Sequence, residues 1–72
     1  PMIFVFPSTH EAIASERVLT GVVPIELMPT PTSISAGCGI VIRVADADLA
    51  RASRLLDEAG RTYRAVSAKG DD

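Results

Sequence analysis

The 72-residue chain has no tryptophan, one cysteine and three aromatic residues, and each shortage excludes a class of protein. A single cysteine cannot form an internal disulfide, so packing, helped by self-association, must hold so small a domain together. Few aromatic rings and a net charge of -2 argue against a nucleic-acid binder, which needs a basic face and stacking rings. The longest apolar run, residues 2–6, is far shorter than the roughly 18 residues of a membrane-spanning helix. We therefore expect a soluble, cytoplasmic protein with no nucleic-acid or membrane partner.

What the chain does contain is typical of a folded globular protein. Hydrophobic residues make up 47% of it and charged residues 22%, a balance unlike that of disordered chains. A chain of this length can build only one core. We therefore expect a single domain over residues 1–68 and a flexible tail at 69–72.

Apolar and alternating runs predict four strands, at residues 3–6, 25–28, 40–44 and 62–67. Two helices are predicted between them, one at 9–19 after the capping-box pair Ser8 and Glu11, and one that Asp46 or Asp48 caps and Gly60 ends. This order predicts an α+β, ferredoxin-like βαββαβ fold. In this predicted fold the helices and an antiparallel sheet form a two-layer sandwich. The first and third strands, which are the most apolar, are expected at the centre of the sheet.

The first predicted strand is apolar on both faces, with Ile3 and Val5 on one side and Phe4 and Phe6 on the other. Two helices can cover only one face of the sheet. We therefore predict that a second copy of the chain, forming a homodimer, or a partner protein packs on the open face.

The segment 29–39 has too many prolines, glycines and small hydroxyl residues for regular structure, and it is long for a connection. Near its end Cys38 lies between Gly37 and Gly39. Flanking glycines permit positive φ and close approach of a substrate, and consecutive amides there can stabilise a thiolate. We predict an exposed, reactive Cys38 supported by Gly37, Gly39 and Ser35; the alternative is a buried, inert cysteine.

His10 is the only histidine and the natural candidate for a base that assists Cys38, although the first turn of a helix equally suits a surface residue. We expect strand 40–44 to run parallel to strand 3–6. That arrangement would place Cys38 and His10 at opposite ends of the sheet unless the loop folds back. One cysteine, one histidine and scattered carboxylates lack the spacing of a zinc site, and no phosphate-binding loop is present, so we expect neither a metal nor a cofactor.

Pro1 suggests a different chemistry. The secondary amine of an N-terminal proline can act as a base, and the opening residues 1–5 look like those of small tautomerases. The rest of the chain departs from the tautomerase pattern. Removal of a preceding methionine, or a sequence that starts part-way along a longer chain, is enough to explain a proline at this position.

Three segments, 6–12, 27–31 and 33–39, resemble the DUF3343 family of selenium/sulfur carrier-like proteins. The likeness spans most of the chain, and the 29–39 segment is its most specific part. The family's cysteine falls on Cys38, and its small neighbours fall on Gly37 and Gly39. The family's helix-start segment falls on Ser8, Thr9 and His10.

The resemblance implies a carrier that holds sulfur or selenium on Cys38 as a persulfide or selenopersulfide. Donor and acceptor proteins would be its partners, and it would be a carrier protein more than a turnover enzyme. The alternative is a non-catalytic regulatory or interaction module that acts through the open sheet face. A Cys38→Ser variant would leave that function intact.

Overall fold

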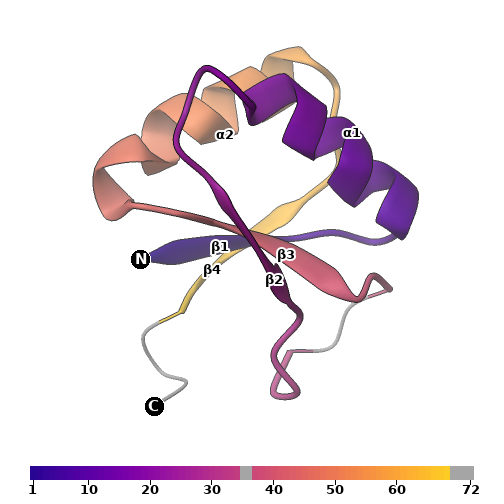
Figure 1. Cartoon of the computed structure of the whole chain (residues 1–72). Coiled ribbons are helices and arrows are strands. Elements are labelled where there is room, and N and C mark those ends of the chain that lie inside the picture. Colours follow the sequence, from indigo (N-terminus) through magenta and orange to yellow (C-terminus); the bar gives the residue numbers. More distant parts are fainter. Residues whose placement is uncertain (35–36, 69–72) are drawn as a thin grey trace.

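The computed structural model describes residues 1–34 and 37–68, so Ser35 and the predicted tail at 69–72 lie outside the described residues. The fold is α+β, with a four-stranded antiparallel sheet and two helices that lie on one side of it (Figure 1). The elements in chain order are β1 (Met2–Val5), α1 (Thr9–Leu19), β2 (Glu26–Pro29), β3 (Ile40–Val44), a 3-10 turn (Asp46–Asp48), α2 (Leu49–Glu58) and β4 (Arg64–Ser67).

The strands lie in the order β2-β3-β1-β4, so the two most apolar strands occupy the centre, as predicted. This order is compatible with the expected ferredoxin-like arrangement. β1 pairs antiparallel with β3, Met2 lying opposite Val44 and Phe4 opposite Ile42. The expectation that these two strands are parallel is therefore wrong. The start of β3 lies at the same end of the sheet as the end of β1, which brings the Cys38 segment to the β1–α1 junction.

The ends of the helices follow from local sequence to different degrees. Ser8 caps α1 as predicted, its Oγ accepting the Glu11 N–H at 3.2 Å. The Glu11 carboxylate reaches to the segment before β4, where Oε1 accepts the Thr62 N–H at 3.1 Å. Asp48 occupies the N-cap position of α2, but its side chain makes no capping hydrogen bond. The 3-10 turn before α2 also begins without a side-chain cap. The predicted capping by Asp46 or Asp48 is therefore wrong. Gly60 ends α2 with a φ of 74°, as expected.

The main core lies between the helices and the sheet. Phe4, Phe6 and Ile42 face the helices and are at most 1% exposed. Leu19 of α1 and Leu56 of α2 pack against them and are fully buried. Burial of one such side chain contributes about 1.5–3 kcal/mol, so this layer supplies most of the stability.

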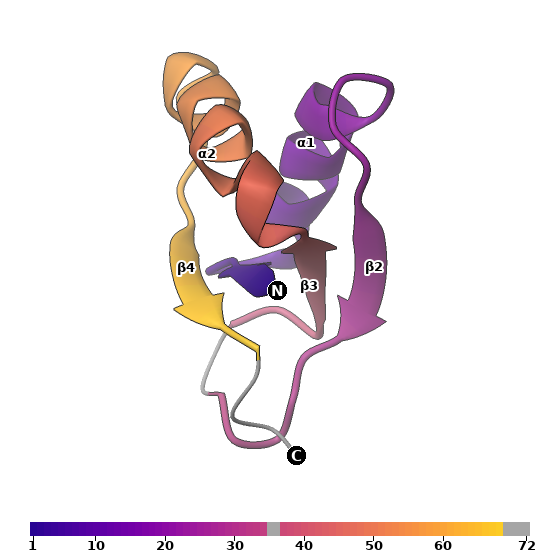
Figure 2. The ribbon, with the colours of Figure 1, turned by 90° about the vertical axis from the view of Figure 1, so that its left-hand side faces the viewer.

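The opposite face of the sheet carries a second apolar cluster of Ile3, Val5 and Val41, each at most 3% exposed. Met28 and Ile34 pack against it, and Ile34 belongs to the long connection between β2 and β3. Figure 2 shows the described parts of this connection on the side of the sheet away from the helices. The chain thus covers much of this face itself, and burial of its apolar residues does not require a second chain. The predicted homodimer stays a prediction.

Candidate functional site

Cys38 lies two residues before β3, with its side chain turned into the protein. The side chain is 5% exposed and belongs to the main core cluster with Phe6 and Ile42. The predicted exposure of this thiol is therefore wrong. The reason is strand alternation, because Cys38 shares the inward-facing register of Ile40, Ile42 and Val44.

The backbone around Cys38 nevertheless runs at the surface, since Gly37 and Gly39 on either side are exposed. The Cys38 Sγ accepts a hydrogen bond from the Ile40 N–H at 3.4 Å. Thr30, just after β2, holds the same backbone, its Oγ1 donating to the Cys38 carbonyl at 2.8 Å. An N–H aimed at sulfur becomes a stronger interaction when the sulfur carries negative charge. The contact therefore suits a negatively charged Sγ.

The two glycines that flank Cys38 have different roles. A Cβ at Gly37 would overlap the carbonyl oxygen of Pro7, whereas a Cβ at Gly39 would face open space. Neither glycine has a positive φ, and among the described residues only Gly21 and Gly60 do. The expectation that left-handed glycines shape this site is therefore wrong. Gly37 is needed because the Cys38 segment crosses the β1–α1 junction at close range.

His10 is exposed on the first turn of α1, three residues after Pro7. Because β1 and β3 are antiparallel, His10 and Cys38 lie at the same end of the sheet, and the expected separation to opposite ends is wrong. In the part of the chain that the structure describes, no group of three histidine, cysteine or carboxylate residues could hold a metal ion.

A pocket of about 290 Å³ lies beside the Cys38 segment, between the end of β1 and the start of β4. Its lining residues are Val5, Phe6, Pro7, Gly37, Thr62, Tyr63 and Arg64. The Tyr63 hydroxyl donates to Asp57 Oδ1 at 2.8 Å and lies 3.3 Å from the Ser53 carbonyl oxygen, and its ring packs edge-on against Phe4. Burial and this carboxylate contact raise the pKa of Tyr63 above 10.0. Sequence reasoning missed this pocket because nothing in the local pattern brings residues 62–64 to residue 37.

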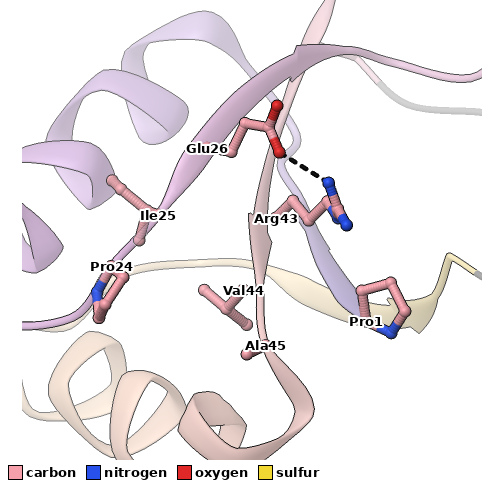
Figure 3. Close-up of a pocket in the computed structure, with 7 residues that line it drawn as sticks. All are labelled: Pro1, Pro24, Ile25, Glu26, Arg43, Val44 and Ala45. Atoms are coloured by element: carbon pink, nitrogen blue, oxygen red, sulfur yellow. Dashed lines mark hydrogen bonds and ion pairs between the residues drawn. The ribbon is translucent and has the colours of Figure 1, made fainter.

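A second pocket, of about 270 Å³, lies at the other end of the sheet (Figure 3). Pro1 lines it, and Arg43 and Glu26 form an ion pair at 2.7 Å within it. Pro1 precedes Met2, which lies opposite Val44 of β3. Val44 comes six residues after Cys38, so Pro1 and Cys38 are separated by roughly 20 Å along the strand direction. A base at Pro1 and a thiol at Cys38 therefore cannot act on one small substrate.

Comparison with protein families matches residues 2–67 of the 72-residue chain to the family described as "Putative Se/S carrier protein-like". No curated protein and no solved structure matches the chain. Across residues 1–34 and 37–68, no helix has the length and apolar character needed to cross a membrane. The matched range runs from β1 to β4 and includes Cys38 with both neighbouring glycines. The chain belongs to the Se/S carrier protein-like family.

Proposed function

We propose that this protein is a sulfur or selenium carrier that holds the transferred atom on Cys38 Sγ and passes it to a partner protein. The observation that carries the proposal is the setting of the sole cysteine. Its sulfur accepts the Ile40 N–H, and its backbone lies at the surface between two exposed glycines. Membership of the Se/S carrier protein-like family supports the same reading.

The chemistry needs only thiol–persulfide exchange. In loading, the Cys38 thiolate attacks the terminal sulfur of a donor protein's persulfide, and the donor leaves as its own thiolate. Cys38 gains one sulfur atom, which keeps its proton, and no external oxidant is needed. In discharge, an acceptor thiolate attacks that terminal sulfur and the Cys38 thiolate leaves. A selenium atom at the terminal position follows the same two steps.

Burial of the thiol has a function in this scheme. The Cys38 side chain is 5% exposed, and in this proposal its inward position also keeps the bound atom away from water and small reductants. Transfer then requires Cys38 to turn outward, and both of its neighbours lack a side chain that would block this movement. A carrier protein needs this setting and a docking surface, whereas a turnover enzyme needs further groups in contact with the substrate.

Donor and acceptor proteins approach, in this proposal, at the end of the sheet where β1 ends and β3 begins. The 290 Å³ pocket there has Gly37 on its wall, directly beside Cys38. His10 is exposed at the same end and is the proposed proton donor or acceptor for the partner's thiol. A homodimer through the open sheet face would leave this end accessible.

The test is loading followed by intact-mass measurement. The purified protein is incubated with a cysteine desulfurase and cysteine, or with a selenium donor, and its mass is recorded without reductant. The proposal predicts a gain of one sulfur or selenium atom that reductant removes. Cys38→Ala is the better control beside Cys38→Ser, because it places no hydroxyl in a buried apolar site. If the wild type gains nothing, the carrier function is wrong and an interaction module is the remaining reading.

A further inference from the structure

Thr30 makes two hydrogen bonds to the backbone around Cys38. It directly follows Pro29, the last residue of β2, which lies opposite Ile40. Proline has no N–H to donate to the neighbouring strand. The Thr30 N–H donates to the Gly39 carbonyl at 3.0 Å, and its hydroxyl donates to the Cys38 carbonyl at 2.8 Å.

These two bonds orient the two peptide planes on either side of Gly39. The Cys38 carbonyl belongs to the plane before Gly39, and the Gly39 carbonyl to the plane after it. Because a peptide unit is planar, the second plane also carries the Ile40 N–H, which donates to Cys38 Sγ at 3.4 Å. Glycine is the residue with the freest backbone torsions, so these planes need an external restraint. Thr30 supplies it from the adjacent strand.

The geometry points to Thr30 as the positioning residue of the carrier site. Its hydroxyl and N–H hold the Cys38 thiol inward, with the Ile40 N–H aimed at the sulfur. This inference rests on the proposed function, because it assigns Thr30 the task of shielding the sulfur atom that Cys38 carries. The contribution of the hydroxyl can be tested by itself, because substitution of the side chain leaves the Thr30 N–H in place.

The experiment compares Thr30→Val, which keeps the shape and loses the hydroxyl, with Thr30→Ser, which keeps the hydroxyl. Two rates are measured in the native protein: alkylation of Cys38 by iodoacetamide, and hydrogen exchange of the Ile40 amide. Loss of one hydrogen bond should make local opening about five- to tenfold more frequent. We expect both rates to rise by that factor in Thr30→Val and to stay near wild type in Thr30→Ser. Thr30→Ala replaces the valine variant if the latter does not fold.

The matched control is Thr20→Val, which removes a hydroxyl that donates to the Glu16 carbonyl at 2.7 Å, at the end of α1. We expect it to change neither rate. The inference is overturned if Thr30→Val leaves both rates unchanged, if Thr30→Ser behaves like Thr30→Val, or if Thr20→Val accelerates both rates equally.

Neither the alkylation rate nor the exchange rate depends on a bound persulfide. A failure of this inference can therefore be distinguished from a failure of the carrier function. A protein that never loads sulfur refutes the carrier function whatever the alkylation rates are. In a protein that does load, reductant should remove the sulfur about five- to tenfold faster from Thr30→Val than from wild type, in line with the same hydrogen bond. Equal removal rates would refute the shielding role of Thr30.

Discussion

The backbone of Gly37 lies against the carbonyl oxygen of Pro7, and the space between them is too small for a Cβ atom. Pro7 lies in the segment that leads from β1 into α1, and Gly37 precedes Cys38, two residues before β3 begins. This contact therefore joins the proposed carrier thiol to the start of the first helix. It follows from the antiparallel pairing of β1 with β3.

Gly37→Ala should destabilise the protein, because its methyl group would overlap the Pro7 carbonyl oxygen. The backbone must shift to relieve the overlap, at a cost of about 1–3 kcal/mol. Gly39→Ala is the matched control, since its Cβ meets open space and its φ is not positive. It should change the free energy of unfolding by no more than about 0.5 kcal/mol. Urea unfolding of both variants measures the difference, and equal stabilities would contradict the close contact.

Two serines of the first helix should respond to alanine with opposite signs. Ser15 is fully buried, and its Oγ has no hydrogen-bond partner among residues 1–34 and 37–68. Ser15→Ala removes this unsatisfied hydroxyl and should stabilise the protein by roughly 1 kcal/mol. Ser8→Ala removes the cap that accepts the Glu11 N–H and should destabilise it by about 1 kcal/mol. Thermal or urea unfolding gives both signs, and a loss of stability in Ser15→Ala would show that its hydroxyl has a partner.

Alkaline pH should weaken the attachment of β4 to α2 through Tyr63. Burial, and then the hydrogen bond to Asp57, raise the pKa of Tyr63 above 10.0. A raised pKa means that this stabilisation is fully present below about pH 10 and is lost as the pH rises through the folded-state value. The unfolding free energy of the wild type should therefore fall above that pH.

Tyr63→Phe is the control for this alkaline effect. It should be less stable than wild type at pH 8 by about 1 kcal/mol, the usual contribution of one hydrogen bond. It should also lose less stability between pH 8 and pH 11. Tyr63 is the only tyrosine, so ultraviolet absorbance follows its ionisation directly. Identical pH dependence of the two proteins would rule out this role for the hydroxyl.

Local sequence signals predicted most of the features that depend on neighbouring residues, although the aspartate cap expected for α2 is absent. The Ser8 cap, the α1 boundaries, the Gly60 stop and β3 at Ile40–Val44 are all predicted correctly. Each depends on residues within a few positions of one another, and the central place of β1 and β3 follows from their apolar composition.

Contacts between distant segments were not predictable in the same way. The sequence places Cys38 in a polar loop, and only its strand register shows that the side chain points inward. The requirement for Gly37 depends on Pro7, thirty positions away, and the cover of the open face depends on where Ile34 packs. Thr30 carries no sequence signal of its own, because its role arises only when β2 lies beside β3.

The central claim is that Cys38 passes on the atom that it receives, and discharge to a second thiol tests it most directly. Protein loaded with one sulfur or selenium atom is separated from the donor and mixed with an excess of a thiol-containing acceptor. The masses of both are then followed without reductant. The account predicts that the protein returns to its unloaded mass while the acceptor gains the atom. The claim is contradicted if the atom stays on Cys38, or if it is lost without appearing on the acceptor.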